Sequence, residues 1–310
     1  MEGAGIHMII ITNSEGAAGL GPALAVLREG GHALDAVEAG IMPVEADPAV
    51  RSVGRGGAPN MLGIVECDAA IMNGTTLETG AVGALQRYLH AISVARGVME
   101  RLPHVMLVGE GAARFAAELG LAPTELLTDA ARAAHHSWVR AHPPAGAGER
   151  EHELPHHTSP AAGHVGGTVI YLVNDAQGHV AAGASTSGWA FKYPGRLGDS
   201  PVIGAGIYAD DRYGACGCTH TGEMTIRCGT ARSVVLYMKR GASVIEACHE
   251  AAADLCHLRR GFIGPVIIHA FDRGGTPYAL AVHAPRPIDY WSWTDDLVQP
   301  HQRTCATHEE

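Results

Sequence analysis

Residues 142–167 divide the sequence into two halves, and this break constrains the possible folds more than any other feature. The segment has no hydrophobic periodicity and is rich in proline, glycine and histidine, which is typical of a loop or linker. A loop of this length inside a compact domain is usually functional or disordered. On both sides of it, short apolar runs alternate with stretches of helical spacing. We therefore expect strands and helices in each half.

The apolar patterns predict specific elements in each half. Before the break, strands are expected at residues 8–11, 62–65, 69–72 and 105–108, and helices from Pro22 onward and at 33–45, 91–102, 109–119 and 130–139. After the break, strands are expected at residues 168–173, 179–186, 204–209, 213–219, 266–271 and 277–282, and helices at 221–240 and 243–258. The last two strands predict a hairpin, because two adjacent glycines separate them.

Charge and composition exclude several classes of protein. The 22 lysines and arginines stand against 32 aspartates and glutamates, a net charge of −10, whereas a nucleic-acid binder needs a basic surface. No polybasic run is present to hold an anionic membrane, and no apolar run reaches 18 residues. The first residues lack the pattern of a secretion signal, and the seven cysteines are an odd number. We therefore predict a cytoplasmic globular protein with reduced thiols.

Three local motifs could bind ligands, and for each we favour a plainer interpretation. The glycines within residues 16–21 follow a strand, but their spacing differs from the dinucleotide fingerprint and indicates a helix-entry turn. Cys216, Cys218 and His220 lack the usual spacing and number of zinc ligands, so ordinary buried thiols are expected. The histidines of the break are expected in a solvated linker: His152, His156, His157 and His164. No metal and no cofactor is predicted.

The unpatterned segment closes with Gly166-Gly167-Thr168. A threonine at the start of a strand is common and by itself means little. If the chain is cut before Thr168, however, the new terminus carries a hydroxyl nucleophile beside its own α-amine. An α-amine has a pKa of about 8, so a good part of it is a neutral base near neutral pH. This is a known way to activate a threonine nucleophile.

Downstream residues could supply the partners that such a nucleophile needs. Thr186 is expected on the adjacent strand. Arg196 and Asp199 lie three residues apart in a glycine-rich turn, where they could hold the carboxylate and the ammonium of an amino acid, or else pair with each other at the surface. Thr219 and His220 end a later strand and could offer a hydroxyl and a backbone N–H to an oxyanion.

At these residues the sequence resembles the N-terminal-nucleophile (Ntn) asparaginases, and within them the glycosylasparaginases. Five stretches of the first half carry the resemblance: GGHALDAVEAG, SVGRGGAPN, IMNGTT, AISVARGVME and LVGEGAARFA. Three stretches of the second half do so as well: GHVAAGASTSG, GRLGDSPVIGAGIYADD and RYGACGCTHTGE. The resemblance covers roughly residues 8–285, and the GRLGDSP–GAGIYADD run is highly specific.

The resemblance implies a fold and a processing step. The fold would be α+β, the four-layer αββα sandwich of the Ntn hydrolases, in a single domain of all 310 residues, 1–310. The chain would cut itself between Gly167 and Thr168. The products would be an α subunit of residues 1–167, in which 142–167 is a flexible linker, and a β subunit of residues 168–310.

The resemblance also implies a reaction and a role for each candidate residue. Thr168 would be the nucleophile, Thr186 would support its hydroxyl, and Ser52 would lie behind the nucleophile. Arg196 and Asp199 would bind the aspartyl head of the substrate. Thr219 and the N–H of His220 would form the oxyanion hole. The expected enzyme is an amidohydrolase that cleaves the side-chain amide of asparagine derivatives such as N4-glycosylasparagine, as a dimer of cleaved αβ units. An isoaspartyl peptidase or L-asparaginase, and an uncleaved inactive scaffold, remain as alternatives.

Four positions depart from the glycosylasparaginase pattern. Gly166-Gly167 replaces His-Asp before the nucleophile, as is common in the plant-type asparaginases. Ile170 replaces a glycine and is expected to crowd the site. His220 replaces the oxyanion-hole glycine and adds a side chain near the leaving group. Residues 12–15 lack the tryptophan that lines the pocket for the sugar-bearing substrate.

Overall fold

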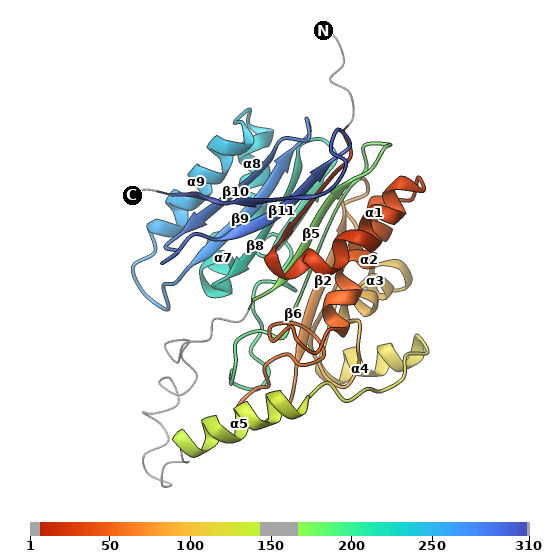
Figure 1. Cartoon of the computed structure of the whole chain (residues 1–310), viewed down its shortest axis with the longest axis vertical. Coiled ribbons are helices and arrows are strands. Elements are labelled where there is room, and N and C mark those ends of the chain that lie inside the picture. Colours follow the sequence, from red (N-terminus) through yellow and green to blue (C-terminus); the bar gives the residue numbers. More distant parts are fainter. Residues whose placement is uncertain (1–6, 143–166, 309–310) are drawn as a thin grey trace.

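The computed structural model describes residues 7–142 and 167–308. Most of the predicted linker, together with the histidines at 152, 156, 157 and 164, lies outside the described residues. In the described ranges the chain forms two β-sheets and eight α-helices (Figure 1). The first half contains β1 (Ile9–Asn13), a 3-10 helix η1 (Ser14–Gly19), α1 (Leu20–Arg28), α2 (Ala33–Ala46), β2 (Cys67–Asn73), β3 (Thr79–Leu85), α3 (Ala91–Arg101), β4 (Met106–Val108), α4 (Gly109–Glu118) and α5 (Asp129–Ala141).

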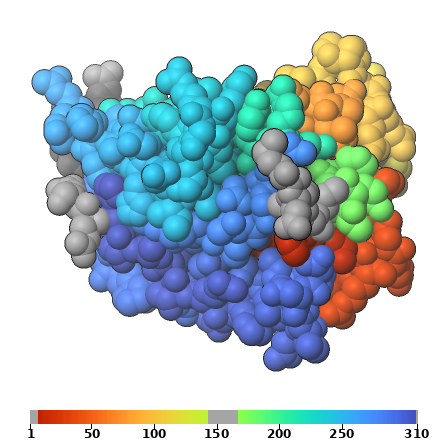
Figure 2. Space-filling model, turned by 90° about the horizontal axis from the view of Figure 1, so that it is seen from above, coloured from red at the N-terminus to blue at the C-terminus, as the bar shows by residue number. Residues whose placement is uncertain are grey.

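The second half supplies strands to both sheets. Its elements are β5 (Val169–Asn174), β6 (Val180–Thr186), β7 (Ile207–Asp210), β8 (Gly214–His220), α7 (Gly222–Cys228), α8 (Thr230–Lys239), α9 (Val244–Cys256), β9 (Val266–Asp272), β10 (Pro277–Val282), β11 (Asp289–Thr294), β12 (His301–Thr304) and β13 (Ala306–Thr307). The larger sheet has the order β12-β11-β1-β5-β6-β2-β3-β4, and the smaller has the order β13-β10-β9-β8-β7. β1 thus pairs with strands of the second half on both sides. Red residues near the N-terminus accordingly share one face with blue residues near the C-terminus (Figure 2).

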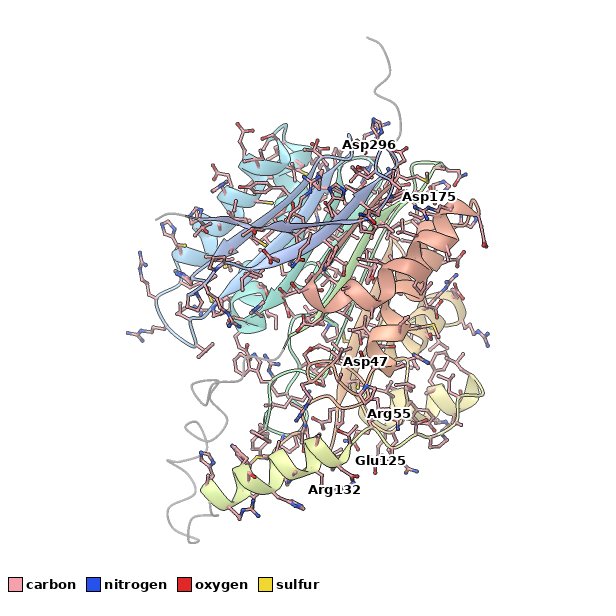
Figure 3. All side chains as sticks on the ribbon, viewed as in Figure 1. Asp47, Arg55, Glu125, Arg132, Asp175 and Asp296 are labelled. Carbon is pink, nitrogen blue, oxygen red and sulfur yellow. The ribbon has the colours of Figure 1, made fainter. Side chains whose placement is uncertain are left out.

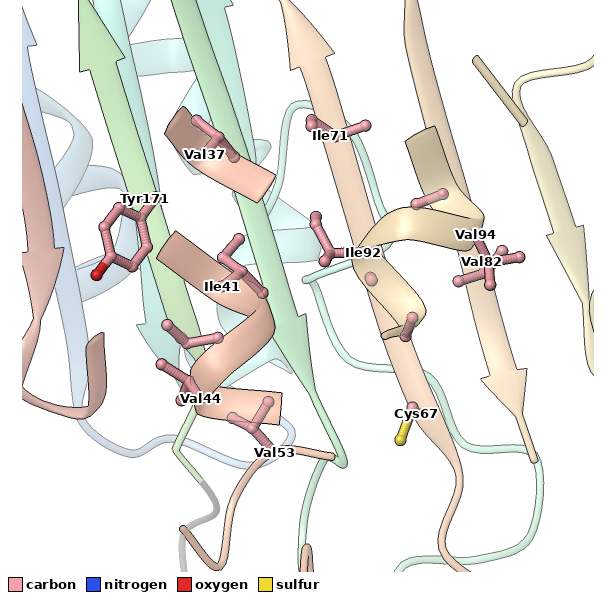
Figure 4. Close-up of a cluster of buried hydrophobic side chains, with 14 of the residues drawn as sticks. Val37, Ile41, Val44, Val53, Cys67, Ile71, Val82, Ile92, Val94 and Tyr171 are labelled. Atoms are coloured by element: carbon pink, nitrogen blue, oxygen red, sulfur yellow. The ribbon is translucent and has the colours of Figure 1, made fainter. Parts of the chain in front are cut away.

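Three clusters of buried apolar side chains hold these elements together. The first lies between α1–α4 and the eight-stranded sheet, where Ile41 of α2, Ile92 of α3 and Tyr171 of β5 are buried (Figure 4). The second joins strands of the two sheets, and the third joins the five-stranded sheet to α7, α8 and α9. Because a sheet must bury both of its apolar faces, the helices cover the outer faces and the sheets pack on each other (Figure 1).

β5 is buried on both faces, and this fixes the direction of its side chains. Val169 belongs to the cluster under the helices, whereas Ile170 belongs to the cluster between the sheets. Side chains alternate between the two faces of a strand. Continued to Thr168, directly before β5, this alternation predicts a side chain on the side that faces the second sheet.

Most of the predicted elements are confirmed to within a few residues, and three predictions are wrong. Residues 62–65 form no strand, and β2 pairs with β3. The sequence of β3, TGAVGAL, gives little strand signal because it is rich in glycine and alanine. The helix expected at 221–240 is broken into α7 and α8 at Gly229, whose φ is +59°. The third error is an omission: β3, β11, β12 and β13 were not predicted.

No helix within the described ranges combines the length and the apolar character that crossing a bilayer requires. The cytoplasmic location stays a prediction.

Candidate active site

The predicted nucleophile lies where three strands of the large sheet end together. Val169 pairs with Ser185 of β6, and Thr12 of β1 pairs with Tyr171. This register brings Thr168, Thr186 and the end of β1 to one edge of the sheet. Asp175, in the turn after β5, marks the opposite end of these strands in Figure 3.

Asn13, the last residue of β1, holds the start of β5 on both sides of Val169. Its Nδ2 donates to the carbonyl of Thr168 at 2.6 Å, and its Oδ1 accepts from the N–H of Ile170 at 3.1 Å. Thr12 adds a hydrogen bond from its Oγ1 to the carbonyl of Ile170 at 2.6 Å. The side chain of Thr168 is 5% exposed. The backbone that carries the predicted nucleophile is therefore fixed by β1.

The Gly167–Thr168 peptide bond is contacted by Thr186. The Thr186 hydroxyl lies 2.9 Å from the Gly167 carbonyl oxygen and donates to it, while the N–H of Gly188 donates to the same hydroxyl at 2.9 Å. The carbonyl of Ser52, at 3.3 Å, is a second acceptor for Thr186. In the uncut chain Thr186 thus polarises the carbonyl of the bond predicted to be cut, in addition to lying beside the predicted nucleophile.

Ile170 packs between the two sheets, and its effect on the site stays a prediction. Its side chain is fully buried between the sheets. A Cβ on Gly217 of β8 would meet the Ile170 Cδ1 at 3.1 Å and Leu172 at 3.3 Å. Because Gly217 has no side chain, the Ile170 side chain fits between the sheets and packs against β8.

Arg196 is held in place by residues that the sequence analysis missed. Its guanidinium forms a bidentate ion pair with Glu223, with Nη2 to carboxylate distances of 2.7 and 2.8 Å, and lies 4.2 Å from the ring centre of Trp189. A Cβ on Gly188 would lie 3.2 Å from Arg196 Nη1, so the guanidinium reaches the segment that follows Thr186. Arg196 pairs with Glu223 and not with Asp199, contrary to the surface-pair interpretation.

Asp199 is a buried carboxylate with a raised pKa. Burial raises the pKa of Asp199 to about 6, and the Thr225 hydroxyl and the charge of Arg196 oppose that rise. Thr225 Oγ1 donates to Asp199 Oδ2 at 2.7 Å. A buried carboxylate of this kind is costly unless it has a positive partner. A substrate ammonium would supply that partner.

Thr219 and His220 end β8 on the sheet that faces Thr168. The Thr219 hydroxyl and His220 Nδ1 are 3.0 Å apart and hydrogen-bonded. His220 has a φ of +83°, a conformation that favours glycine and that costs other residues about 1–2 kcal/mol. Burial, with a smaller effect of Arg286, lowers the pKa of His220 to about 4, so the imidazole is neutral at neutral pH.

Ser52 lies behind Gly167 in the wall of a cavity of about 750 Å³. Glu15, Arg51, Gly167 and Phe191 line the same cavity. The Ser52 hydroxyl donates to Glu15 Oε1 at 3.2 Å, and its carbonyl accepts from Ser187 at 2.7 Å. Ser52 thus connects the cavity wall to the end of β6.

The potential metal ligands lie elsewhere. Cys216 and Cys218 are buried in the cluster under α7–α9, and burial raises the pKa of the Cys216 thiol. Of the residues described, His32, Asp175 and His179 place ligand atoms within 4.8 Å of one another. They lie at the far end of β5 from Thr168, and both oxygens of Asp175 already accept backbone N–H groups.

Comparison with known proteins decides the family. A family model described as asparaginase matches residues 17–283. The chain belongs to the asparaginase family. The N(4)-(β-N-acetylglucosaminyl)-L-asparaginases of Rattus norvegicus and Elizabethkingia miricola are 36% and 40% identical to it, over 78% and 76% of this chain and 75% and 66% of their own. The isoaspartyl peptidase/L-asparaginase of Homo sapiens is 36% identical, over 78% of this chain and 75% of its own.

Within this asparaginase-family chain, several residues at the candidate site escaped sequence analysis, among them Asn13, Glu15 and Glu223. Each acts on a residue more than 25 positions away in sequence: Asn13 on Thr168, Glu15 on Ser52 and Glu223 on Arg196. A polar residue at the end of a buried strand is the available signal for Asn13, because strand ends and the loops after them often carry functional side chains. No local pattern identifies the other two.

Proposed function

We propose that this chain is a self-processing amidohydrolase whose mature nucleophile is the N-terminal threonine Thr168. The observation that carries the proposal is the environment of the Gly167–Thr168 bond. Asn13 fixes the Thr168 carbonyl, and the Thr186 hydroxyl donates to the Gly167 carbonyl. Donors aimed at a carbonyl stabilise the oxyanion that forms when it is attacked. The names of the relatives, which are hydrolases of amide C–N bonds, point to the same chemistry.

The proposed cut leaves subunits of residues 1–167 and 168–310 within one domain. Both would remain parts of a four-layer αββα sandwich, which the three apolar clusters support. The mature enzyme would be a dimer of cleaved αβ units, without a cofactor. The dimer rests on the family resemblance alone.

In the proposed reaction, Arg196 binds the α-carboxylate and Asp199 the α-ammonium of an aspartyl substrate. The Thr168 hydroxyl attacks the side-chain amide carbonyl while the free α-amine of Thr168 takes the hydroxyl proton and passes it to the leaving amine. Thr219 and the N–H of His220 stabilise the oxyanion. Water then hydrolyses the β-aspartyl ester and releases aspartate.

The leaving group distinguishes two candidate activities. Cleavage of N4-glycosylasparagine is the first, since relatives at up to 40% identity carry that name. Isoaspartyl peptidase or L-asparaginase activity is the second, since relatives of that name are up to 37% identical and Gly167 precedes the nucleophile. Relative kcat/KM for glycosylasparagine, β-aspartyl dipeptides and asparagine separates the two.

Intact mass measurement of the purified protein tests the proposal. We expect two fragments that meet at Gly167–Thr168, and no hydrolysis by a Thr168→Ala variant, which keeps the fold but lacks the hydroxyl. A single persistent chain of 310 residues that binds aspartate without turnover would identify an inactive scaffold instead. Undiminished hydrolysis by Thr168→Ala would show that another residue is the nucleophile.

A further inference from the structure

Glu15 occupies the space in which a side chain at position 167 would lie. An ideal Cβ built on Gly167 would be 1.8 Å from Glu15 Oε1, far inside van der Waals contact. The carboxylate comes from η1, directly after β1, and reaches the residue that carries the predicted scissile carbonyl. The absence of a side chain at Gly167 therefore leaves room for the Glu15 carboxylate beside this residue.

The same carboxylate is attached to the residues that hold Thr168. Asn13 Nδ2 donates both to Glu15 Oε2 and to the Thr168 carbonyl. Ser52 donates to the other oxygen, Glu15 Oε1, at 3.2 Å. Glu15 is thus fixed against both residues of the Gly167–Thr168 bond, Gly167 by contact and Thr168 through Asn13.

The uncut chain has a chemical need for such a group. The base proposed for the mature enzyme is the free α-amine of Thr168, but before cleavage this nitrogen is part of a peptide bond and is not basic. A different group must accept the hydroxyl proton during the first cut. Asp199 is hydrogen-bonded to Thr225 and His220 to Thr219, whereas Glu15 is a carboxylate that lies against Gly167.

We propose that Glu15 is the proton acceptor for self-cleavage at Gly167–Thr168, an inference that rests on the proposed self-processing. The Thr168 Oγ1 forms a bond to the Gly167 carbonyl carbon as Glu15 takes the hydroxyl proton. The carbon–nitrogen bond then breaks, and Glu15 returns the proton to the Thr168 nitrogen. Water hydrolyses the resulting ester, which leaves a carboxylate on Gly167 and a free amine and hydroxyl on Thr168.

The electrostatic setting of Glu15 suits this role. Burial raises the pKa of Glu15, and the hydrogen bonds from Ser52 and Asn13 oppose the rise. Of the cavity-lining residues, Arg51 is the other charged one, and Ser52 and Asn13 do not titrate in the accessible pH range. A carboxylate with a raised pKa is a stronger base, but it becomes protonated, and so cannot accept a proton, once the pH falls below that pKa. Self-cleavage should therefore be slow below that pKa, rise with pH through it and level off above.

The test is the rate of self-cleavage, followed by intact mass over a series of pH values. Glu15→Gln should slow the cut about 10²–10⁴-fold, the usual range for a general base, and lose the acidic limb of the profile. Glu15→Asp should recover part of the rate, and added formate should accelerate a Glu15→Ala variant. Glu29→Gln, at an exposed glutamate of the same helical region, is the matched control and should cut at the wild-type rate.

Gly167→Ala provides an independent variant. It leaves every ionisable group in place but puts a Cβ where Glu15 Oε1 lies, so it should slow the cut as well. Circular dichroism of each variant separates loss of fold from loss of rate. Wild-type cleavage rates in Glu15→Gln would overturn the role of Glu15 alone. A wild-type protein that never cuts would overturn the proposed self-processing and, with it, this role.

Discussion

At the residue scale, the hydroxyl of Thr186 makes the most informative contact, because it donates to the carbonyl of a bond that the sequence marks for cleavage. The sequence indicates Thr168, Thr186, Arg196 and Asp199 as candidates, since each stands in a run typical of the family. It could not identify their partners, because hydrogen bonds between residues far apart in the sequence leave no local pattern. Asn13 and Glu15 are of this kind.

Replacing Thr186 by valine should slow self-cleavage by about 10²–10³-fold, the usual loss for one oxyanion donor. Valine keeps the shape of the side chain but cannot donate to the Gly167 carbonyl. Thr186→Ser keeps the hydroxyl and is the matched control. The measurement is the fraction of uncut chain over time by intact mass. Equal rates in the valine and serine variants would show that this hydrogen bond does not assist the cut.

Binding of L-aspartate to the cut enzyme should weaken as the pH falls below about 6. The pKa of Asp199 is raised to about 6, so the carboxylate becomes protonated below that pH and loses its attraction for the substrate ammonium. Calorimetric titration over a pH series measures the effect. Thr225→Val removes a hydrogen bond that lowers this pKa and should move the acidic limb to higher pH. Affinity that is constant through this range would contradict the role of Asp199.

At the element scale, the strands flanking the site were predictable, as were the β5–β6 and β9–β10 pairings, but the rest of the strand order was not. Apolar runs of strand length revealed β1, β5, β6, β9 and β10. The small residues of β3 concealed a strand that pairs with β2, because glycine and alanine leave no apolar alternation to detect. The apolar spacing typical of a helix continues across the turn at Gly229. Such spacing shows which residues are buried, but it does not show that the backbone changes direction there.

Shortening Ile170 to alanine should destabilise the protein by about 2–5 kcal/mol without speeding the reaction. The side chain fills the space opposite Gly217 between the two sheets, so its removal leaves a cavity there. Urea unfolding in a Thr168→Ala background keeps all samples uncut. Ile245→Ala, at a position 48% exposed on α9, should change stability by less than about 0.5 kcal/mol. A faster enzyme of unchanged stability would support the interpretation that Ile170 crowds the site.

At the scale of the whole molecule, the order of strands in the large sheet interleaves the two proposed subunits. β1 lies between β11 and β5, and β6 lies beside β2. Cutting at Gly167–Thr168 therefore leaves hydrogen-bonded ladders between the fragments on both sides of β1.

The two fragments should consequently elute together in size-exclusion chromatography and separate only under denaturing conditions. The ladders of β1 with β11 and β5, together with that of β2 with β6, remain after the cut. Uncut Thr168→Ala protein is the control and should elute at the same volume. Separation of the fragments in native buffer would show that the interleaved sheet does not hold them.

The same interleaving means that the cut enzyme cannot refold in the way that the uncut chain folds. While the chain is continuous, the pairing of β1 with β5 is a first-order step, and its entropy cost is that of closing one loop. After the cut, the same sheet can form again only when two separate polypeptides encounter each other, so renaturation becomes second order and depends on concentration. Until the two fragments meet, β1 and β2 lack the strands of the second half with which they pair. A denatured mature enzyme should thus regain activity slowly at low concentration, whereas its uncut precursor should recover independently of dilution.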